Sequence, residues 1–256
     1  DLHRRRHSFP TRRSSDLYQI INVAKQKKPD LPDFGEVSGV VIMGGPMGAL
    51  DYDKYPGLKA EAKLARAAVS VGKPVLGVCL GHQIIATALG AKLKSGEAPE
   101  IGFAPIKCID KHDYFSMWNK TVDVLHWHND VVSLPEGAQP LARSAKTKVQ
   151  AFRFGSALGM QFHLEVTPTM LEEWLDESSM VKDLKAAGGS KSQLREAFAE
   201  YNPRLQPLAE QVFGVSAMEA IGAPLSRFIP ERFRAAHAKH VDQFGVTGVS
   251  ERQMGR

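Results

Sequence analysis

The sequence predicts an α/β protein with a parallel sheet, because two short apolar runs each lead into a helical pattern. The runs are residues 39–45 (GVVIMGG) and 73–78 (KPVLGV). Continuous apolar runs of this length are typical of strands that are buried on both faces of a sheet. Strands that alternate with helices along a chain indicate βαβ units.

A helix is expected after each of these strands. Apolar residues repeat at helical spacing from residue 58 to residue 69, and Gly72 stands where a helix C-cap belongs. The second helix is predicted over residues 82–90 and ends at Gly90. A shorter β-favouring run, residues 18–24, precedes the first strand.

The middle of the chain changes character. Short β-favouring runs separated by turn residues follow one another from residue 101 to residue 165. Residues 167–177 and 192–213 then carry helical patterns. We therefore predict a single folded domain over residues 18–213.

The two ends of the chain are expected to lie outside this domain. Residues 1–17 are rich in Arg and Ser and contain no β-favouring run, which predicts disorder. This segment is either foreign to the protein or a natural disordered arm. Residues 214–256 form a C-terminal extension of unknown role, in which His237 and His240 are expected on a solvated face.

The positive charge of the chain also gathers at its ends. The formal net charge is +5, of which residues 1–17 and 226–256 carry +3 each, which leaves −1 for the remainder. A nucleic-acid-binding protein has its basic face on the folded body, so no nucleic-acid partner is expected. Apolar runs stay well below the roughly 18 residues that a membrane-spanning helix needs. Two cysteines make no disulfide framework, and we expect a reducing, cytoplasmic location.

Cys79 lies between two glycines, where the strand at 73–78 meets the second helix. The segment GVCLG (77–81) is the cysteine counterpart of the G-x-S-x-G nucleophile elbow. Such a turn holds the nucleophile in strained geometry, and its glycines let the backbone crowd together. The sulfur also sits at a helix N-terminus, which favours the thiolate. We predict that Cys79 is a nucleophile and that Cys108, inside an apolar strand, is structural.

A cysteine nucleophile needs a base, and the base needs an orienting group. The run GMQFHLE (159–165) contains both candidates, His163 and Glu165. On a strand their side chains point to the same face, so that Glu165 can fix and polarise the imidazole. A lone histidine is more often a surface or core residue, but the elbow elsewhere in the chain favours a catalytic pair.

Glycines also end the strand at 39–45. Gly44 and Gly45, followed by Pro46, would let backbone N–H groups approach a ligand and stabilise an oxyanion. A phosphate-binding loop is the alternative. It is disfavoured because the segment lacks both the GxGxxG pattern and the P-loop lysine.

Two other histidines raise the question of a metal site. His126 and His128 share one face of a predicted strand and could in principle hold an ion. The sequence offers no Cys or carboxylate near them at ligand spacing. We therefore predict substrate-loop and structural roles for this pair, and no metal site.

Three motifs together resemble the class I glutamine amidotransferases. They are GGPM (44–47), GVCLGHQ (77–83) and QFHLEVTP (161–168), in this order. The resemblance is strongest to stand-alone proteins related to the amidotransferase domain of GMP synthase. It implies a flavodoxin-like, mostly parallel sheet with helices on both faces, and a reaction that needs no cofactor.

The resemblance also implies a role for each site residue. Cys79 would attack glutamine, or another γ-glutamyl compound, to give a thioester and ammonia, with His163 as base and then acid and Glu165 as its orienting group. The backbone N–H groups of Gly45 and Leu80 would stabilise the oxyanion. The substrate would be bound by Gln83, His128, Asn129 and Asp130. A separate ammonia-accepting synthetase chain is an expected partner, because no synthetase motif is present.

Two features depart from the family pattern. Leu164 stands between His163 and Glu165, where the family usually has proline. The family also begins with a strand and a helix before the equivalent of residues 18–24, so the chain is expected to lack its first β-α unit.

Other functions fit parts of the pattern. A γ-glutamyl peptidase would use the same triad with a different leaving group. A non-catalytic regulatory domain is disfavoured, because a pseudoenzyme usually loses its cysteine or histidine first. A cysteine hydrolase or redox sensor on a related fold is disfavoured by the His-x-Glu pair, which follows Cys79 by 84 residues as in amidotransferases.

Overall fold

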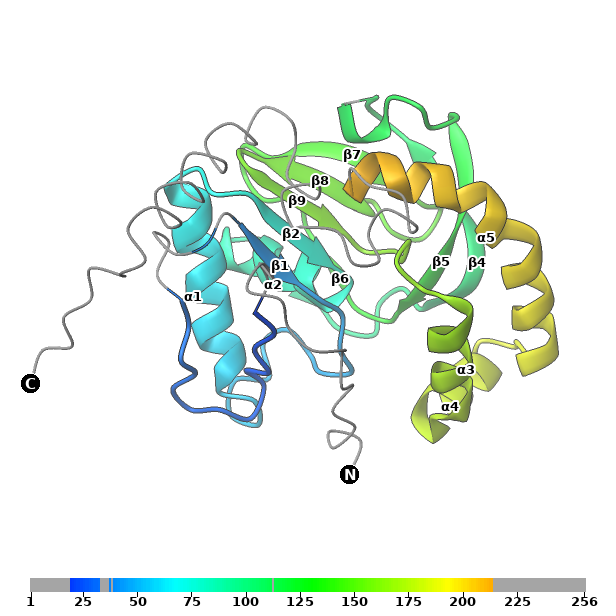
Figure 1. Ribbon diagram of the computed structural model, residues 1–256, viewed down its shortest axis with the longest axis horizontal. Helices are drawn as coiled ribbons and strands as arrows, with labels where there is room; N and C mark the ends of the chain where they lie inside the picture. Colours follow the sequence, from blue (N-terminus) through cyan, green and yellow to red (C-terminus); the bar gives the residue numbers. More distant parts are fainter. Residues whose placement is uncertain (1–18, 33–36, 38, 112, 214–256) are drawn as a thin grey trace, which may run out of the picture. The chain divides into compact units, whose positions relative to one another are not determined.

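The computed structural model of the chain describes residues 19–32, 37, 39–111 and 113–213 (Figure 1). One unit, Ile21–Val212, contains the helices and strands that build the site. The predictions for residues 1–17 and 214–256 lie outside the described residues. None of the described helices is long and apolar enough to cross a lipid bilayer.

A seven-stranded sheet organises this unit, in the order β1-β2-β9-β8-β7-β4-β5. Its strands are β1 (Val40–Ile42), β2 (Val75–Val78), β4 (Glu100–Cys108), β5 (Thr121–His128), β7 (Gln139–Arg143), β8 (Ala151–Phe154) and β9 (Ala157–Met160). Strands β1, β2 and β9 pair in parallel, and the strands from β9 to β5 pair in antiparallel fashion. A separate small sheet pairs β3 (Leu93–Lys94) with β6 (Val131–Val132).

All four predicted helices are present, and residues 178–186 form a further helix that was not predicted. The helices are α1 (Gly57–Ser70), α2 (Leu80–Ala88), α3 (Pro168–Asp176), α4 (Ser178–Ala186) and α5 (Lys191–Phe213), with a short 3₁₀ helix at Asp113–Phe115. The expected glycine ends of α1 and α2 are confirmed, since Gly72 and Gly90 have φ of 72° and 92°. The α/β class and the flavodoxin-like amidotransferase fold are likewise confirmed.

The β-favouring run at residues 18–24 does not form a strand over its described part. Ile20 is 77% exposed, whereas Val23 is buried. A Cβ on Gly57 would lie 1.7 Å from the Val23 carbonyl oxygen, so this segment packs tightly against the start of α1. A β-favouring segment forms a strand only where a neighbouring strand pairs with it. Here the segment packs against helix α1 instead.

Two apolar cores hold the sheet between its helices. Helices α1 and α2 pack beside β1 and β2, with Leu58, Ile84 and Ile85 at most 1% exposed. Helices α3 to α5 pack beside β4 and β5 (Figure 1), where Leu125 and Leu175 are buried. The C-terminal end of β2 leads directly into α2, within the first of these cores.

Candidate active site

Cys79 occupies the turn between β2 and α2. It is the only non-glycine residue with a positive φ in the described part of the chain, at φ 53° and ψ −105°. Backbone in such a sparsely populated region costs about 1–3 kcal/mol and persists only when the surroundings enforce it. The strained elbow predicted from the sequence is confirmed as geometry.

The flanking glycines enforce this turn. A Cβ on Gly77 would lie 2.5 Å from the backbone of Gly81, and a Cβ on Gly81 would lie 2.0 Å from the carbonyl oxygen of Ile42. Any side chain at either position would therefore push β1, β2 and α2 apart. Helix α2 begins at Leu80, two residues earlier than predicted, because the strand passes into the helix within this one residue.

Sheet register brings Cys79 and His163 together across 84 residues of sequence. Val78 on β2 pairs in parallel with Met160 on β9, and the Cys79 N–H donates to the Met160 carbonyl oxygen at 2.8 Å. A Cβ on Gly44 would lie 3.5 Å from both Cys79 Cβ and His163 Cε1. Gly44 therefore leaves room for the two side chains to face each other.

His163 and Glu165 form a close pair, although not on a strand. Strand β9 ends at Met160, and His163 is held instead by a bridge to Leu125, whose carbonyl oxygen accepts its N–H at 2.8 Å. His163 Nδ1 lies 2.6 Å from Glu165 Oε1. The contact predicted from strand alternation is present, but the chain reaches it just beyond the strand.

Leu164, which departs from the family pattern, supports Glu165. Its backbone N–H donates to Glu165 Oε2 at 3.0 Å. Proline has no N–H and could not make this bond. The leucine therefore gives Glu165 a hydrogen bond on the oxygen that does not face His163.

The charges around His163 favour its protonated form. Burial by itself would lower the pKa of His163, but the Glu165 carboxylate and the nearby Cys79 sulfur raise it well above its usual range. Burial would raise the pKa of Glu165, and the imidazole opposite lowers it instead. An imidazolium–carboxylate pair therefore stands beside the sulfur.

Cys79 Sγ and His163 Nε2 both retain hydrogen-bonding capacity. Cys79 Sγ lies 3.6 Å from the carbonyl oxygen of Trp127. His163 Nε2 is buried, and among the described residues no hydrogen bond of ordinary geometry satisfies it. The arrangement leaves Nε2 available for a proton transfer.

Trp174, which the sequence did not single out, packs against this histidine and in turn contacts Trp127. Trp174 on α3 meets the His163 ring edge-on at 5.0 Å between centroids, and Trp127 on β5 meets Trp174 at 5.5 Å. Nothing in the local sequence distinguishes Trp174 from an ordinary residue of an amphipathic helix. Only the packing of α3 against β5 brings it to the site.

The predicted oxyanion donors are neighbours. A Cβ on Gly45 would lie 3.1 Å from Leu80 Cδ2. Leu80 is the first residue of α2, so its N–H is one of those that lack an acceptor within the helix. Both backbone positions adjoin the Cys79 turn.

The predicted substrate-binding residues also gather around the elbow. Gln83, on the first turn of α2, donates from Nε2 to the Asp130 carbonyl oxygen at 3.3 Å and to Gln161 Oε1 at 3.1 Å. The Asn129 carbonyl oxygen accepts the Ala98 N–H at 3.4 Å. The segment 128–130 is thus tied to α2 by the Gln83 side chain.

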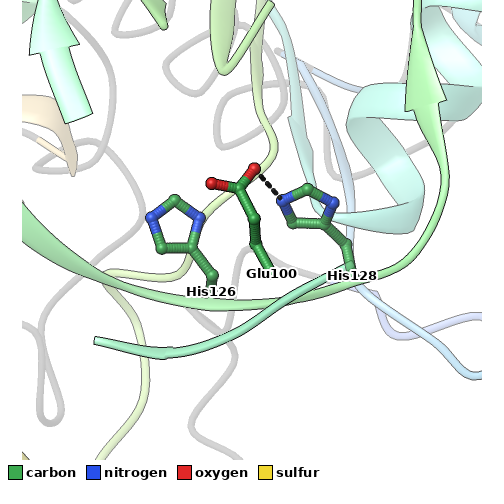
Figure 2. A group of neighbouring side chains, drawn as sticks. All are labelled: Glu100, His126 and His128. Carbon is green, nitrogen blue, oxygen red and sulfur yellow. Dashed lines mark ion pairs between the residues drawn. The ribbon is translucent and has the colours of Figure 1, made fainter. Parts of the chain in front are cut away.

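A buried carboxylate corrects one argument made from the sequence. Glu100 on β4 pairs across the sheet with His128 on β5 and lies between the rings of His128 and His126 (Figure 2). Its Oε2 is 3.4 Å from His128 Nε2. The premise that no carboxylate stands near the histidine pair is wrong, because Glu100 is 26 residues away in sequence and reaches them through strand pairing.

Differential alkylation of the two cysteines provides a first test. Both are 8% exposed, so accessibility alone does not separate them. Burial raises the pKa of the Cys108 thiol, whereas Cys79 stands at a helix N-terminus beside a histidine, where cysteines react fast. We expect iodoacetamide at neutral pH to modify Cys79 about tenfold faster or more, as measured by peptide mass mapping. Preferential modification of Cys108 would contradict the elbow argument.

Comparison with known proteins identifies the family of this chain. The family model of class-I glutamine amidotransferases matches residues 12–180. One subunit of the glutamine-hydrolyzing GMP synthase of Ignicoccus hospitalis is 35% identical over 142 residues, which cover 54% of this chain and 72% of that protein. A glutamine amidotransferase structure from Thermotoga maritima has a TM-score of 0.66 at 32% identity and covers 72% of this chain and 80% of its own. A glutamine amidotransferase from Methylobacillus flagellatus has a TM-score of 0.63 at 29% identity and covers 72% and 78%. The chain is a member of the class I glutamine amidotransferase family.

Proposed function

We propose that this chain hydrolyses the side-chain amide of glutamine through a thioester on Cys79 and releases ammonia. The observation that carries the proposal is the positive-φ Cys79 turn, which faces a buried His163–Glu165 pair. Strain at a nucleophile, together with a base and its orienting group, is the arrangement that acyl transfer requires. Family membership supplies glutamine as the substrate.

In the first half of the reaction, the Cys79 proton lies on His163 Nε2 and the thiolate sulfur attacks the amide carbon. The backbone N–H groups of Gly45 and Leu80 stabilise the resulting oxyanion. His163 then gives the proton to the amide nitrogen, the C–N bond breaks, and ammonia leaves. The γ-glutamyl group remains as a thioester on the sulfur.

In the second half, water attacks the thioester carbon while His163 takes one of its protons. A second oxyanion forms at the same two N–H groups. It collapses with cleavage of the C–S bond, which releases glutamate and leaves the thiolate beside the protonated His163. Glu165 keeps the same imidazole nitrogen directed at the reacting atoms in both halves.

The segment 128–130 and Gln83 bind the amino-acid end of the substrate. Backbone groups of this segment adjoin the elbow, and the Gln83 side chain fixes their distance from α2. We further propose that a separate synthetase chain receives the ammonia, because the relatives include proteins named as single subunits of a GMP synthase.

Substrate profiling tests the proposed function. The purified chain is assayed with glutamine, with glutathione and with γ-glutamyl dipeptides, and both ammonia and free amino acid are measured. We expect glutamine to have the highest kcat/KM. Peptides hydrolysed about tenfold better than glutamine would replace the proposal with γ-glutamyl peptidase activity, which differs only in the leaving group.

Replacing Glu165 with glutamine tests the role of its charge. Without the carboxylate, burial dominates and the pKa of His163 falls. We expect kcat/KM to drop about 10²–10⁴-fold, and the alkaline limb of the pH profile to move to lower pH.

The matched control is Glu172→Gln, which removes an exposed carboxylate of α3 that pairs with Arg195. It is expected to leave both the rate and the profile unchanged. A Glu165→Gln profile that coincides with that of the unmodified chain would exclude Glu165 as the group that sets the His163 charge.

A further inference from the structure

A buried polar cluster lies on the face of β5 opposite Trp127. It consists of Glu100, His126 and His128, which are 7%, 0% and 5% exposed. One side-chain ligand atom from each residue lies within 4.8 Å of the other two. Figure 2 shows the Glu100 carboxylate between the two imidazole rings.

Backbone carbonyls determine which ring nitrogens carry protons. His126 Nε2 lies 3.2 Å from the Ala104 carbonyl oxygen, and His128 Nδ1 lies 3.2 Å from that of Asp130. A carbonyl only accepts, so each of these nitrogens must donate its N–H. The other nitrogen of each neutral ring, His126 Nδ1 and His128 Nε2, therefore presents a lone pair.

The cluster brings the imidazole rings and the carboxylate into direct contact. His128 Nε2 is 3.4 Å from Glu100 Oε2, and His126 Nδ1 is buried without a hydrogen-bond partner among the described residues. Either a proton on His128 or a bound cation balances the buried carboxylate, and only a cation would also give His126 Nδ1 a partner.

The outer contacts of the cluster are those of a metal site. Ser144 Oγ, Thr147 Oγ1 and Gln150 Nε2 donate to Glu100 Oε2 at 3.0, 2.6 and 2.9 Å. Metal-binding histidines typically donate their second N–H to a carbonyl, as both do here, and metal-binding carboxylates are themselves hydrogen-bonded.

The amide oxygen of Gln150 is a candidate for the fourth ligand atom. Gln150 Oε1 is buried, and no described residue donates a hydrogen bond to it. Gln150 Nε2 lies 3.5 Å from His128 Nε2, so a rotation of the amide would bring the oxygen to the same place and would replace the hydrogen bond from Nε2 to Glu100. Two imidazoles, a carboxylate and an amide oxygen would together supply four ligand atoms, the number that a tetrahedral ion takes.

We propose that Glu100, His126 and His128 bind one divalent transition-metal ion, with Zn²⁺ the best match. Imidazole and carboxylate ligands suit Zn²⁺, which prefers four-coordinate sites with bonds of about 2.0–2.2 Å. Such bonds place ligand atoms about 3.4 Å apart. The side chains therefore close in from 4.8 Å when the ion binds.

The ion would brace the active site without touching the reacting atoms. The Trp127 carbonyl next to Cys79 and the Asp130 carbonyl next to Gln83 both belong to the stretch of chain that carries the two histidines. A metal that ties His126 and His128 to β4 would hold this stretch in place. The binding site stands independently of the proposed glutaminase activity.

Zinc binding is best measured in a Cys79→Ala chain, because the Cys79 and His163 side chains could themselves capture the ion. Metal-free protein is titrated with Zn²⁺ by calorimetry, and the bound ion is counted by mass spectrometry. We expect one equivalent per chain and a rise in the thermal midpoint. Glu100→Gln and His126→Gln should each lower affinity by more than about 100-fold, since loss of an outer contact alone costs about 10–100-fold.

The matched control is Glu97→Gln, which changes an exposed carboxylate paired with Lys94 and should keep full zinc affinity. X-ray absorption of the zinc-loaded Cys79→Ala chain adds a measurement that does not depend on whether the cluster variants fold. It should show nitrogen and oxygen ligands with imidazole scattering. A sulfur ligand, an absence of stoichiometric zinc, or zinc retained by both cluster variants would each overturn the proposal and leave the cluster as a proton-bridged hydrogen-bond network.

Discussion

Replacing Cys79 with serine or alanine is expected to lower kcat for glutamine hydrolysis by about 10⁴-fold or more. The sulfur is the atom that forms the thioester, and loss of a nucleophile removes the contributions of its base and orienting group as well. A hydroxyl in the same place is too weakly acidic to substitute. Steady-state ammonia release at saturating glutamine measures the effect.

Cys108→Ser is the control for this experiment. Cys108 is the last residue of β4, and its N–H donates to the backbone carbonyl oxygen of Lys120. No glycine-flanked turn surrounds it. We expect at least half of the activity to remain in this variant. If activity survived in Cys79→Ser but disappeared in Cys108→Ser, the nucleophile would be Cys108 and the assignment to Cys79 would be wrong.

Replacing Gly81 with alanine is expected to abolish activity and to destabilise the fold. The new Cβ would lie 2.0 Å from the Ile42 carbonyl oxygen, which is backbone and cannot rotate away. Overpacking of this kind costs about 1–3 kcal/mol or more. A shift of about 1 Å in the Cys79 turn would by itself cost about 10²-fold in rate.

Thermal unfolding followed by circular dichroism, together with the ammonia assay, separates the two effects. Gly188→Ala is the control, because Gly188 lies between α4 and α5 with φ of 82° and nothing within 4 Å of its new Cβ. It should lose about 1–2 kcal/mol of stability from the backbone strain alone and keep its activity. Equal losses of activity in both variants would show that the close approach at the elbow is unimportant.

Local sequence predicted the elements whose signal lies within a few residues. The run at 73–78, the glycines around Cys79 and the helix repeat after residue 58 each specify backbone geometry directly. The structure has a strand, a strained turn and helix α1 at these places. Short-range sterics and apolar periodicity suffice for such features, since both depend on neighbours along the chain.

Other features depended on which segments pair. Residues 18–24 have strand propensity but pack against α1, and His163 lies beyond the end of β9 on a bridge to Leu125. Trp174 is an unremarked residue of an amphipathic helix until α3 packs on β5. Long-range contacts of this kind leave no spacing in the sequence from which they could be predicted.

The sequence by itself determined the residue types of the candidate site: a cysteine in a glycine elbow, and a histidine with a glutamate two residues later. Only the tertiary structure decided that the parallel register of β2 and β9 joins them, and that antiparallel pairing of β4 and β5 brings Glu100 to His126 and His128. The physical reason is that a strand's own residues choose its conformation, whereas its neighbour and register are chosen by the burial of the whole sheet.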